Sequence, residues 1–268
     1  MHSKYLSYYL GLLAFWCVAL TWYNMGVWHQ IHQVKAKRKP PLPFTPVSPP
    51  TVLFDNTPWH PLVCVVVTFK QPKLEDWGRQ IAHKNVARMY KSMSTHGVAA
   101  FLATTGSSPV DSEKIWREAG NSGIIPGVET NEHGTPFLRS LFERVEQRCP
   151  SSTPFVAYAN ADIMFDAGLV NTLTTLKKWG KDRLLVVGQR RNHGLKGGLT
   201  WEEIQNVPSD LFLDVAQDYF VMSRGLLGDW STLPPYVIGR RAYDNALVDW
   251  AFHHANLVDT SKTITALH

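Results

Sequence analysis

Residues 62–69 read Leu-Val-Cys-Val-Val-Val-Thr-Phe, and the fold follows from this stretch. β-Branched side chains favour extended backbone, and an unbroken apolar run is typical of a strand that is covered on both faces. Such strands belong to parallel sheets with helices packed on either side. The stretch therefore predicts the first strand of an α/β domain.

Downstream of this strand, helical and extended patterns alternate. Apolar side chains recur at helical spacing over residues 77–93, 137–145, 169–179 and 242–255. Further strands are expected at 98–104, 123–128, 155–165, 183–188, 219–223 and 263–268. The alternation predicts an α/β domain over 62–268, with a mostly parallel sheet flanked by helices. Ligands of such sheets bind at the carboxyl ends of the strands, and we expect the first half to hold a nucleotide.

Upstream, residues 5–28 contain no charged side chain, and aromatic rings lie near both ends of this stretch. About 20 apolar residues span the ~30 Å hydrocarbon core of a bilayer, and Trp and Tyr favour its interfaces. A cleaved signal peptide has a shorter apolar region of ~7–15 residues before its cleavage site. We expect one N-terminal transmembrane helix, an uncleaved signal-anchor over 5–28, after a short tail over 1–4.

Residues 29–61 are expected to form a basic and Pro-rich stem. Repeated prolines fix φ and remove amide donors, which leaves an extended spacer. Four basic residues follow the predicted span, and a positive-inside count would place the C-terminal domain in the cytoplasm. These residues are Lys35, Lys37, Arg38 and Lys39. The chain has no Asn-x-Ser/Thr acceptor, so glycosylation does not decide the orientation.

The charge of the chain argues against a nucleic-acid partner. The 27 Lys and Arg against 22 Asp and Glu give a net charge of +5, and the four basic residues of the stem account for most of it. The remaining chain is therefore close to neutral. The three cysteines, Cys17, Cys64 and Cys149, are too few for a disulfide framework, and the absence of a Cys-x-x-Cys pair excludes a zinc site made of thiolates.

The sharpest polar feature is Tyr158-Ala-Asn160-Ala-Asp162. Here the strand expected over 155–165 runs into Asn160 and Asp162, which are two residues apart and would point the same way. A carboxylate at the end of a buried strand needs a partner. A divalent cation such as Mg²⁺ or Mn²⁺, bridging Asp162 to a diphosphate, would supply it. Capping of the next turn by Asp162 explains the residue equally well.

Other polar residues follow the later strands and helices. Asp218 enters the strand expected at 219–223, and Asp244 lies in the first turn of the last helix, where it acts either as a general base or as a favourable charge at a helix N-terminus. Arg190 and Arg191 follow the strand at 183–188 and are suited to phosphate or carboxylate oxygens. His268 ends the last strand, although a lone histidine is more often a polar surface residue.

Four stretches together resemble one family. They are Tyr158-Ala-Asn-Ala-Asp-Ile, Asp218-Tyr-Phe-Val, Pro234-Pro-Tyr-Val-Ile-Gly-Arg and Tyr243-Asp-Asn-Ala-Leu-Val. With the anchor and the stem, they resemble poorly characterised Golgi-type glycosyltransferase-like proteins of plants and aquatic animals, which have the GT-A nucleotide-diphospho-sugar transferase fold. The resemblance covers about residues 62–268.

The resemblance implies a role for each matching residue. Asp162 matches the last acidic position of the DxD motif, which binds Mn²⁺ or Mg²⁺ on the donor diphosphate, while Asn160 stands where the first Asp usually is. His268 matches a C-terminal histidine on the same metal. Asp244 matches the base of inverting members, and Asp218 would lie near the donor sugar or the acceptor.

The resemblance also implies the ligands and the location. Thr68 and Phe69 would approach the nucleotide base, and Arg190 and Arg191 would neutralise the leaving nucleoside diphosphate. The donor is a nucleotide-diphospho-sugar and the acceptor is a glycan, protein or lipid, in the Golgi lumen. A non-catalytic GT-A-like binding module is the alternative that Asn160 favours. A nucleotidyltransferase is the third hypothesis, but residues 68–74, Thr-Phe-Lys-Gln-Pro-Lys-Leu, lack a Gly-rich phosphate loop.

Overall fold

The computed structural model describes residues 60–69, 77–105, 110–121, 123–194, 197–213, 216–240 and 243–268. The transmembrane helix expected at 5–28 and nearly all of the stem lie outside these residues. Within the described ranges, every helix is too short or too polar to cross a bilayer.

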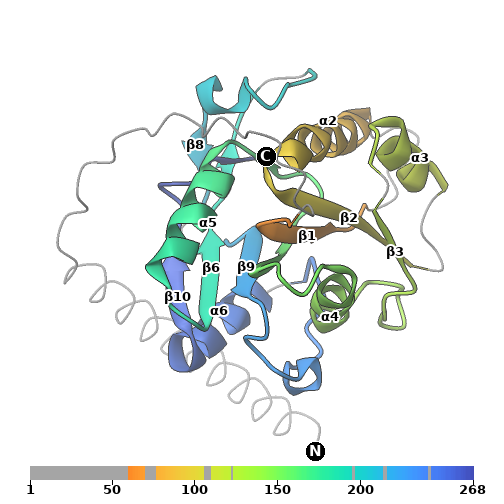
Figure 1. Cartoon of the computed structure of the whole chain (residues 1–268). Coiled ribbons are helices and arrows are strands. Elements are labelled where there is room, and N and C mark those ends of the chain that lie inside the picture. The colour runs from red at the N-terminus through yellow and green to blue at the C-terminus, as the bar shows by residue number, and fades with distance from the viewer. Residues whose placement is uncertain are drawn as a thin grey trace, which may run out of the picture. The chain divides into compact units, whose positions relative to one another are not determined.

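Seven strands form the central sheet, in the order β10-β6-β9-β4-β1-β2-β3 (Figure 1). Their bounds are β1 Val63–Val67, β2 Val98–Thr104, β3 Ile124–Pro126, β4 Phe155–Ala159, β6 Leu184–Gly188, β9 Tyr219–Ser223 and β10 Asn256–Asp259. Only β9 runs antiparallel to its neighbours within this sheet, and the other pairings are parallel. The mostly parallel sheet predicted from the sequence is confirmed.

Strand β1 is buried along its whole length, as its composition predicts. Val63, Val65 and Val67 face a core that helices α2 and α5 cover, while Cys64 and Val66 face a second core under α4 and α6. The helix bounds are α2 Trp77–Met93, α3 Val110–Glu118, α4 Leu138–Arg148, α5 Gly168–Trp179 and α6 Tyr243–His254. Helices therefore cover both faces of the sheet (Figure 1).

One expected strand is divided in two. The sequence predicts a single strand over 155–165, but β4 ends at Ala159 and the chain turns before β5, Met164–Phe165. Strand β5 belongs to a second, four-stranded sheet in the order β5-β11-β7-β8. Its other strands are β11 Ala266–Leu267, β7 Arg191–Asn192 and β8 Asp210–Leu211. The strand expected at 263–268 is likewise reduced to β11.

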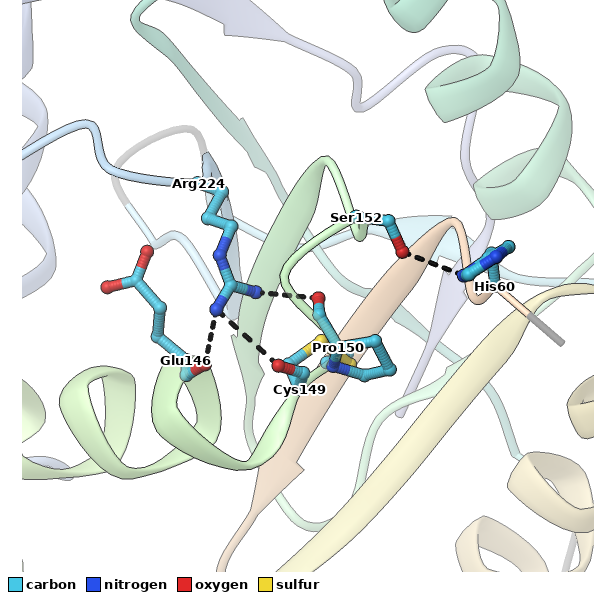
Figure 2. The surroundings of a disulfide bond; sticks show 7 residues. His60, Glu146, Cys149, Pro150, Ser152 and Arg224 are labelled. Atoms are coloured by element: carbon cyan, nitrogen blue, oxygen red, sulfur yellow. Dashed lines mark hydrogen bonds between the residues drawn. A yellow bond between two sulfur atoms is a disulfide. The ribbon is translucent and has the colours of Figure 1, made fainter. Parts of the chain in front are cut away.

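A disulfide joins Cys64 of β1 to Cys149 at the end of α4, across 85 residues of sequence (Figure 2). The sequence did not indicate this single bond, because the spacing of the three cysteines singles out no pair. Both cysteines are buried in the second core. Arg224 holds the same end of α4, since its guanidinium donates to the carbonyls of Glu146 at 2.7 Å and Pro150 at 3.0 Å.

Candidate active site

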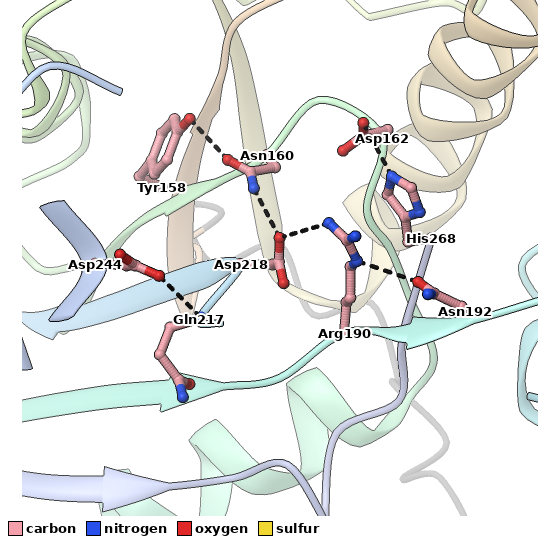
Figure 3. Close-up of polar contacts among 9 residues, drawn as sticks. All are labelled: Tyr158, Asn160, Asp162, Arg190, Asn192, Gln217, Asp218, Asp244 and His268. Carbon is pink, nitrogen blue, oxygen red and sulfur yellow. Dashed lines mark hydrogen bonds and ion pairs between the residues drawn. The ribbon is translucent and has the colours of Figure 1, made fainter. Parts of the chain in front are cut away.

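The candidate site begins where β4 ends, at Asn160. The chain turns here, and the N–H of Ile163 donates to the Asn160 carbonyl at 3.2 Å. The sequence predicted that the side chains of Asn160 and Asp162 would point the same way, and this prediction is wrong because the strand does not continue through them. Asn160 contacts Asp218 and Asp162 contacts His268 (Figure 3).

Asp162 and His268 form a partly exposed pair. The Nε2 atom of His268 lies 3.3 Å from Asp162 Oδ2, and the two side chains are 35% and 41% exposed. Leu267 places the histidine, because it pairs with Met164 of β5 and with Arg191 of β7. Burial raises the pKa of Asp162, but the hydrogen bond and the charge of His268, together with the Arg190 guanidinium, outweigh it and leave that pKa below its usual value.

Asp218 lies deeper, just before β9, and is only 4% exposed. Its Oδ1 atom accepts a hydrogen bond from Asn160 Nδ2 at 2.9 Å and lies 3.3 Å from Arg190 Nη1. Burial raises the pKa of Asp218 above its usual value, and Arg190 and Asn160 offset this only in part.

The two adjacent arginines have different surroundings. Arg190 donates through Nε to Asn192 at 3.1 Å, and its guanidinium lies 4.0 Å from the ring centre of Phe212, so the side chain is held on several sides beside Asp218. Arg191 instead donates to the hydroxyl and the carbonyl of Ser209, at 3.0 and 2.7 Å. Arg190 therefore belongs to the site, whereas Arg191 lies in β7 of the four-stranded sheet and binds Ser209.

Asp244 lies in the first turn of α6, where its Oδ2 accepts the Gln217 N–H at 3.4 Å. This contact places Asp244 next to the residue that precedes Asp218 (Figure 3). The preceding Tyr243 shares a hydrogen bond with Tyr158, and burial raises the pKa of both hydroxyls. The charge of Asp244 adds to the rise in the pKa of Tyr243, its neighbour in α6.

The two residues expected at the nucleotide base are also separated. Thr68 is half-buried after β1, and its hydroxyl shares a hydrogen bond with Tyr158. Phe69 is buried in the core and stacks on the ring of His83, with a centroid distance of 4.2 Å. Of this pair, only Thr68 contacts a residue of the site.

Sequence reasoning missed four residues that hold the site together: Tyr158, Asn192, Phe212 and Gln217. Tyr158 carries a detectable pattern, since it precedes Asn160 by two residues at the end of a buried strand. The other three are joined to the site by hydrogen bonds and a ring contact that no local sequence pattern predicts.

The residues present fit a divalent cation that a ligand helps to hold. Among the described residues, no group of three or more His, Cys, Asp and Glu side chains is arranged to hold a metal. Asp162 and His268 still offer one carboxylate oxygen and one imidazole nitrogen at a partly exposed position, a donor set that suits Mn²⁺. Diphosphate oxygens and water would complete the coordination, as is usual for cations bound with phosphates.

No protein-family model and no curated protein matches this chain. Similar solved structures include a putative nucleotide-diphospho-sugar transferase from Desulfovibrio desulfuricans G20, with 10% identity, coverage of 75% of this chain and 80% of that one, and a TM-score of 0.46. Glucosyl-3-phosphoglycerate synthase from M. tuberculosis has 14% identity, coverage of 78% and 72%, and a TM-score of 0.44. A putative glucose-1-phosphate thymidylyltransferase from Bacillus anthracis has 8% identity, coverage of 76% and 89%, and a TM-score of 0.45. Identities and scores this low transfer no residue role to this chain.

Proposed function

We propose that this protein is a glycosyltransferase that moves a sugar from a nucleotide-diphospho-sugar to an acceptor hydroxyl with the help of a divalent cation. One observation carries the proposal. At the carboxyl edge of a mostly parallel sheet, Asp162 pairs with His268 and also interacts with the charge of Arg190, an arginine that Asp218 holds in place (Figure 3). A cation-binding pair next to a fixed guanidinium suits a diphosphate, whose charge grows as it leaves.

The proposed reaction is a displacement at the anomeric carbon of the donor sugar. The acceptor oxygen bonds to this carbon while the bond to the diphosphate oxygen breaks, and the nucleoside diphosphate departs. Asp162 and His268 would hold Mn²⁺ or Mg²⁺, which when bound supplies positive charge to the leaving group. Arg190 donates hydrogen bonds to the same diphosphate, and Asp244 accepts the proton of the acceptor hydroxyl. Because the acceptor oxygen attacks in one step from the face opposite the diphosphate, the configuration at the anomeric carbon inverts.

Two other functions have less support. Nucleotidyl transfer calls for a Gly-rich phosphate loop after the first strand, and residues 68–74 contain no glycine. A non-catalytic binding module is favoured by Asn160, whose side chain bonds to Asp218 and Tyr158 and leaves one carboxylate, Asp162, beside His268. Such a module would bind Mn²⁺ and nucleotide without turnover.

The location is part of the same proposal: a single-pass membrane protein, anchored by residues 5–28, with residues 62–268 in the lumen of the Golgi. The buried Cys64–Cys149 disulfide supports it, because disulfides persist in oxidising compartments and are rare in the cytosol. We give this bond more weight than the basic residues at 35–39, which begin several positions beyond the predicted span.

The test uses the full-length chain, purified in a mild detergent, with Mn²⁺ and a panel of nucleotide sugars, and it scores release of nucleoside diphosphate. We expect metal-dependent release from one donor and its loss in the Asp162→Ala and His268→Ala variants. Asp182→Ala, at an exposed position before β6, is the control and should keep full activity. Binding of Mn²⁺ and nucleotide without release from any donor would favour the non-catalytic module.

A further inference from the structure

The backbone N–H, the backbone carbonyl and both ends of the side-chain amide of Asn160 all make hydrogen bonds within the protein. Its N–H donates to the Asp218 carbonyl at 3.1 Å, and its own carbonyl accepts the N–H of Ile163 at 3.2 Å. In the side chain, Oδ1 accepts the Tyr158 hydroxyl at 3.0 Å and Nδ2 donates to Asp218 Oδ1 at 2.9 Å. The side chain is thus turned toward Asp218 and not toward the Asp162–His268 pair (Figure 3).

An amide at this position suits both neighbours of Asn160. An ionised carboxylate only accepts hydrogen bonds, so Asp218 needs a donor, and the hydroxyl of Tyr158 needs an acceptor. An asparagine supplies both, one from each end of its amide. An aspartate would satisfy Tyr158 but would set a second carboxylate against the buried Asp218, and like charges at this distance repel strongly.

The contact continues from Asp218 to Arg190. The same Oδ1 atom that accepts from Asn160 also lies 3.3 Å from Arg190 Nη1. Asn192 takes the Nε–H of Arg190 and Phe212 covers the face of the guanidinium. A guanidinium has five N–H donors, of which these contacts use two, and the Arg190 side chain remains 21% exposed. No other acceptor among the described residues binds this guanidinium, so its other donors are available to an anion.

We propose that Asn160 is a positioning residue which, through Asp218, holds the Arg190 guanidinium for an anionic group of the ligand, and that it is not a weakened cation ligand. The identity of the anion as a diphosphate rests on the proposed function. The connection from Asn160 through Asp218 to Arg190 rests on the contacts alone. The two carboxylates of the site thereby have different roles: Asp162 binds the cation, and Asp218 holds the guanidinium of Arg190.

The test compares wild type with four variants, all as full-length chains in detergent. They are Asn160→Asp, Asp218→Asn, the double variant that combines these two substitutions, and Arg190→Gln. Mn²⁺ binding is followed by electron paramagnetic resonance with the metal alone, and binding of UDP and GDP by calorimetry. Thermal unfolding without ligand gives stability. Because hydrogen bonds to charged groups are stronger than those between neutral groups, we expect Asn160→Asp to weaken nucleoside diphosphate binding about tenfold, and we expect the same of Arg190→Gln.

Three further results decide the matter. Asn160→Asp should leave Mn²⁺ affinity within about twofold of wild type and lower Tm by at least about 3 °C. The double variant restores one amide facing one carboxylate, so it should recover most of the lost Tm and nucleotide affinity. Tighter Mn²⁺ binding by Asn160→Asp with an unchanged Tm would overturn the proposal, because position 160 would then be a cation ligand.

The stability measurement keeps this inference separate from the proposed function. Should wild type bind neither Mn²⁺ nor nucleotide, the proposed function fails and the anion role of Arg190 fails with it. The loss of Tm in Asn160→Asp and its recovery in the double variant would still confirm the connection between Asn160 and Asp218. An equal Tm for all of these chains would refute it.

Discussion

The absence of a side chain at Gly188 makes room for Tyr219 on the neighbouring strand. The two residues pair across β6 and β9, and a Cβ atom built on Gly188 would overlap the hydroxyl and the ring of Tyr219. That hydroxyl contacts Thr260 Oγ1 at 2.9 Å, and Thr260 Oγ1 in turn donates to the Val187 carbonyl at 3.0 Å. Glycine at this position therefore lets a buried tyrosine join β9 to the end of β10.

We accordingly expect Gly188→Ala to destabilise the fold by about 1–3 kcal/mol, the usual effect of overpacking a core, measured by urea unfolding. Gly78→Ala is the matched control. Gly78 is exposed on α2, and a Cβ atom added to it would meet no other atom within 4 Å, so alanine there should be neutral or slightly stabilising. Equal effects of the two substitutions would contradict the role given to Gly188.

Asp218 predicts a pH dependence of stability. Burial raises its pKa, so the folded chain holds this proton more tightly than the unfolded chain. The resulting stabilisation is present below the unfolded pKa and is lost as pH rises through the folded pKa. The free energy of unfolding of wild type minus that of Asp218→Asn should therefore increase as pH falls from about 7 to about 4. Urea unfolding of both chains across this range measures it, and an increase toward high pH would mean that the Arg190 ion pair outweighs burial.

The disulfide links two elements that are far apart in sequence, β1 and α4. Because it closes a long loop and lies in a core, we expect Cys149→Ser to lower the free energy of unfolding by about 2–5 kcal/mol. Cys17→Ser serves as the control and should leave the unfolding of the domain unchanged.

Thiol counting provides an independent check of this bond. Before reduction, the Cys17→Ser chain should show no reactive thiol, whether it is folded or denatured. After reduction, the denatured chain should show two. Two free thiols in the unreduced, denatured chain would show that Cys64 and Cys149 are not joined.

Strand β11 has only two residues, yet it joins β5 to β7 and positions His268. Leu267 is fully buried, so Leu267→Ala should cost about 2–5 kcal/mol and also weaken Mn²⁺ binding, because the imidazole loses its fixed position beside Asp162. Leu211→Ala in β8 of the same sheet is the comparison, since Leu211 is 43% exposed. We expect it to stay within about 0.5 kcal/mol of wild type in unfolding and to bind Mn²⁺ unchanged.

Elements with strong internal patterns could be predicted from the sequence, and weakly patterned ones could not. Helix α2 and strands β2 and β9 have the predicted bounds because their apolar residues alone define them. Helix α3 was missed because it has only nine residues and because Ser112, which shares its buried face with Trp116 at i, i+4 spacing, is polar and so hides the apolar stripe. Strand β10 was missed as a short and partly exposed strand at the edge of the sheet.

The site residues likewise divide into those that the sequence predicts and those that it does not. The sequence singled out Asp162, Arg190, Asp218 and His268, because polar residues at the ends of buried strands are conspicuous. It could not tell that Asn160 turns to Asp218, 58 positions away, since the apolar residues at 163–165 continue the pattern of a strand through the turn. Pairings of this range depend on the order of the strands in the sheet, which no local pattern encodes.

The order of the strands in the whole domain differs from their order along the chain, and this matters while the protein is being synthesised. Strand β6 pairs only with β9 and β10 in the central sheet, and both follow it in the sequence. From Gly188 to Tyr219 the ribosome adds 219 − 188 = 31 residues, which takes roughly 2–6 s at about 5–20 residues per second. Throughout this interval Leu-Leu-Val-Val of β6 has no neighbour, and it is an apolar segment of the kind that aggregates. A chaperone that shields residues 184–188 until β9 emerges should therefore raise the yield of folded protein.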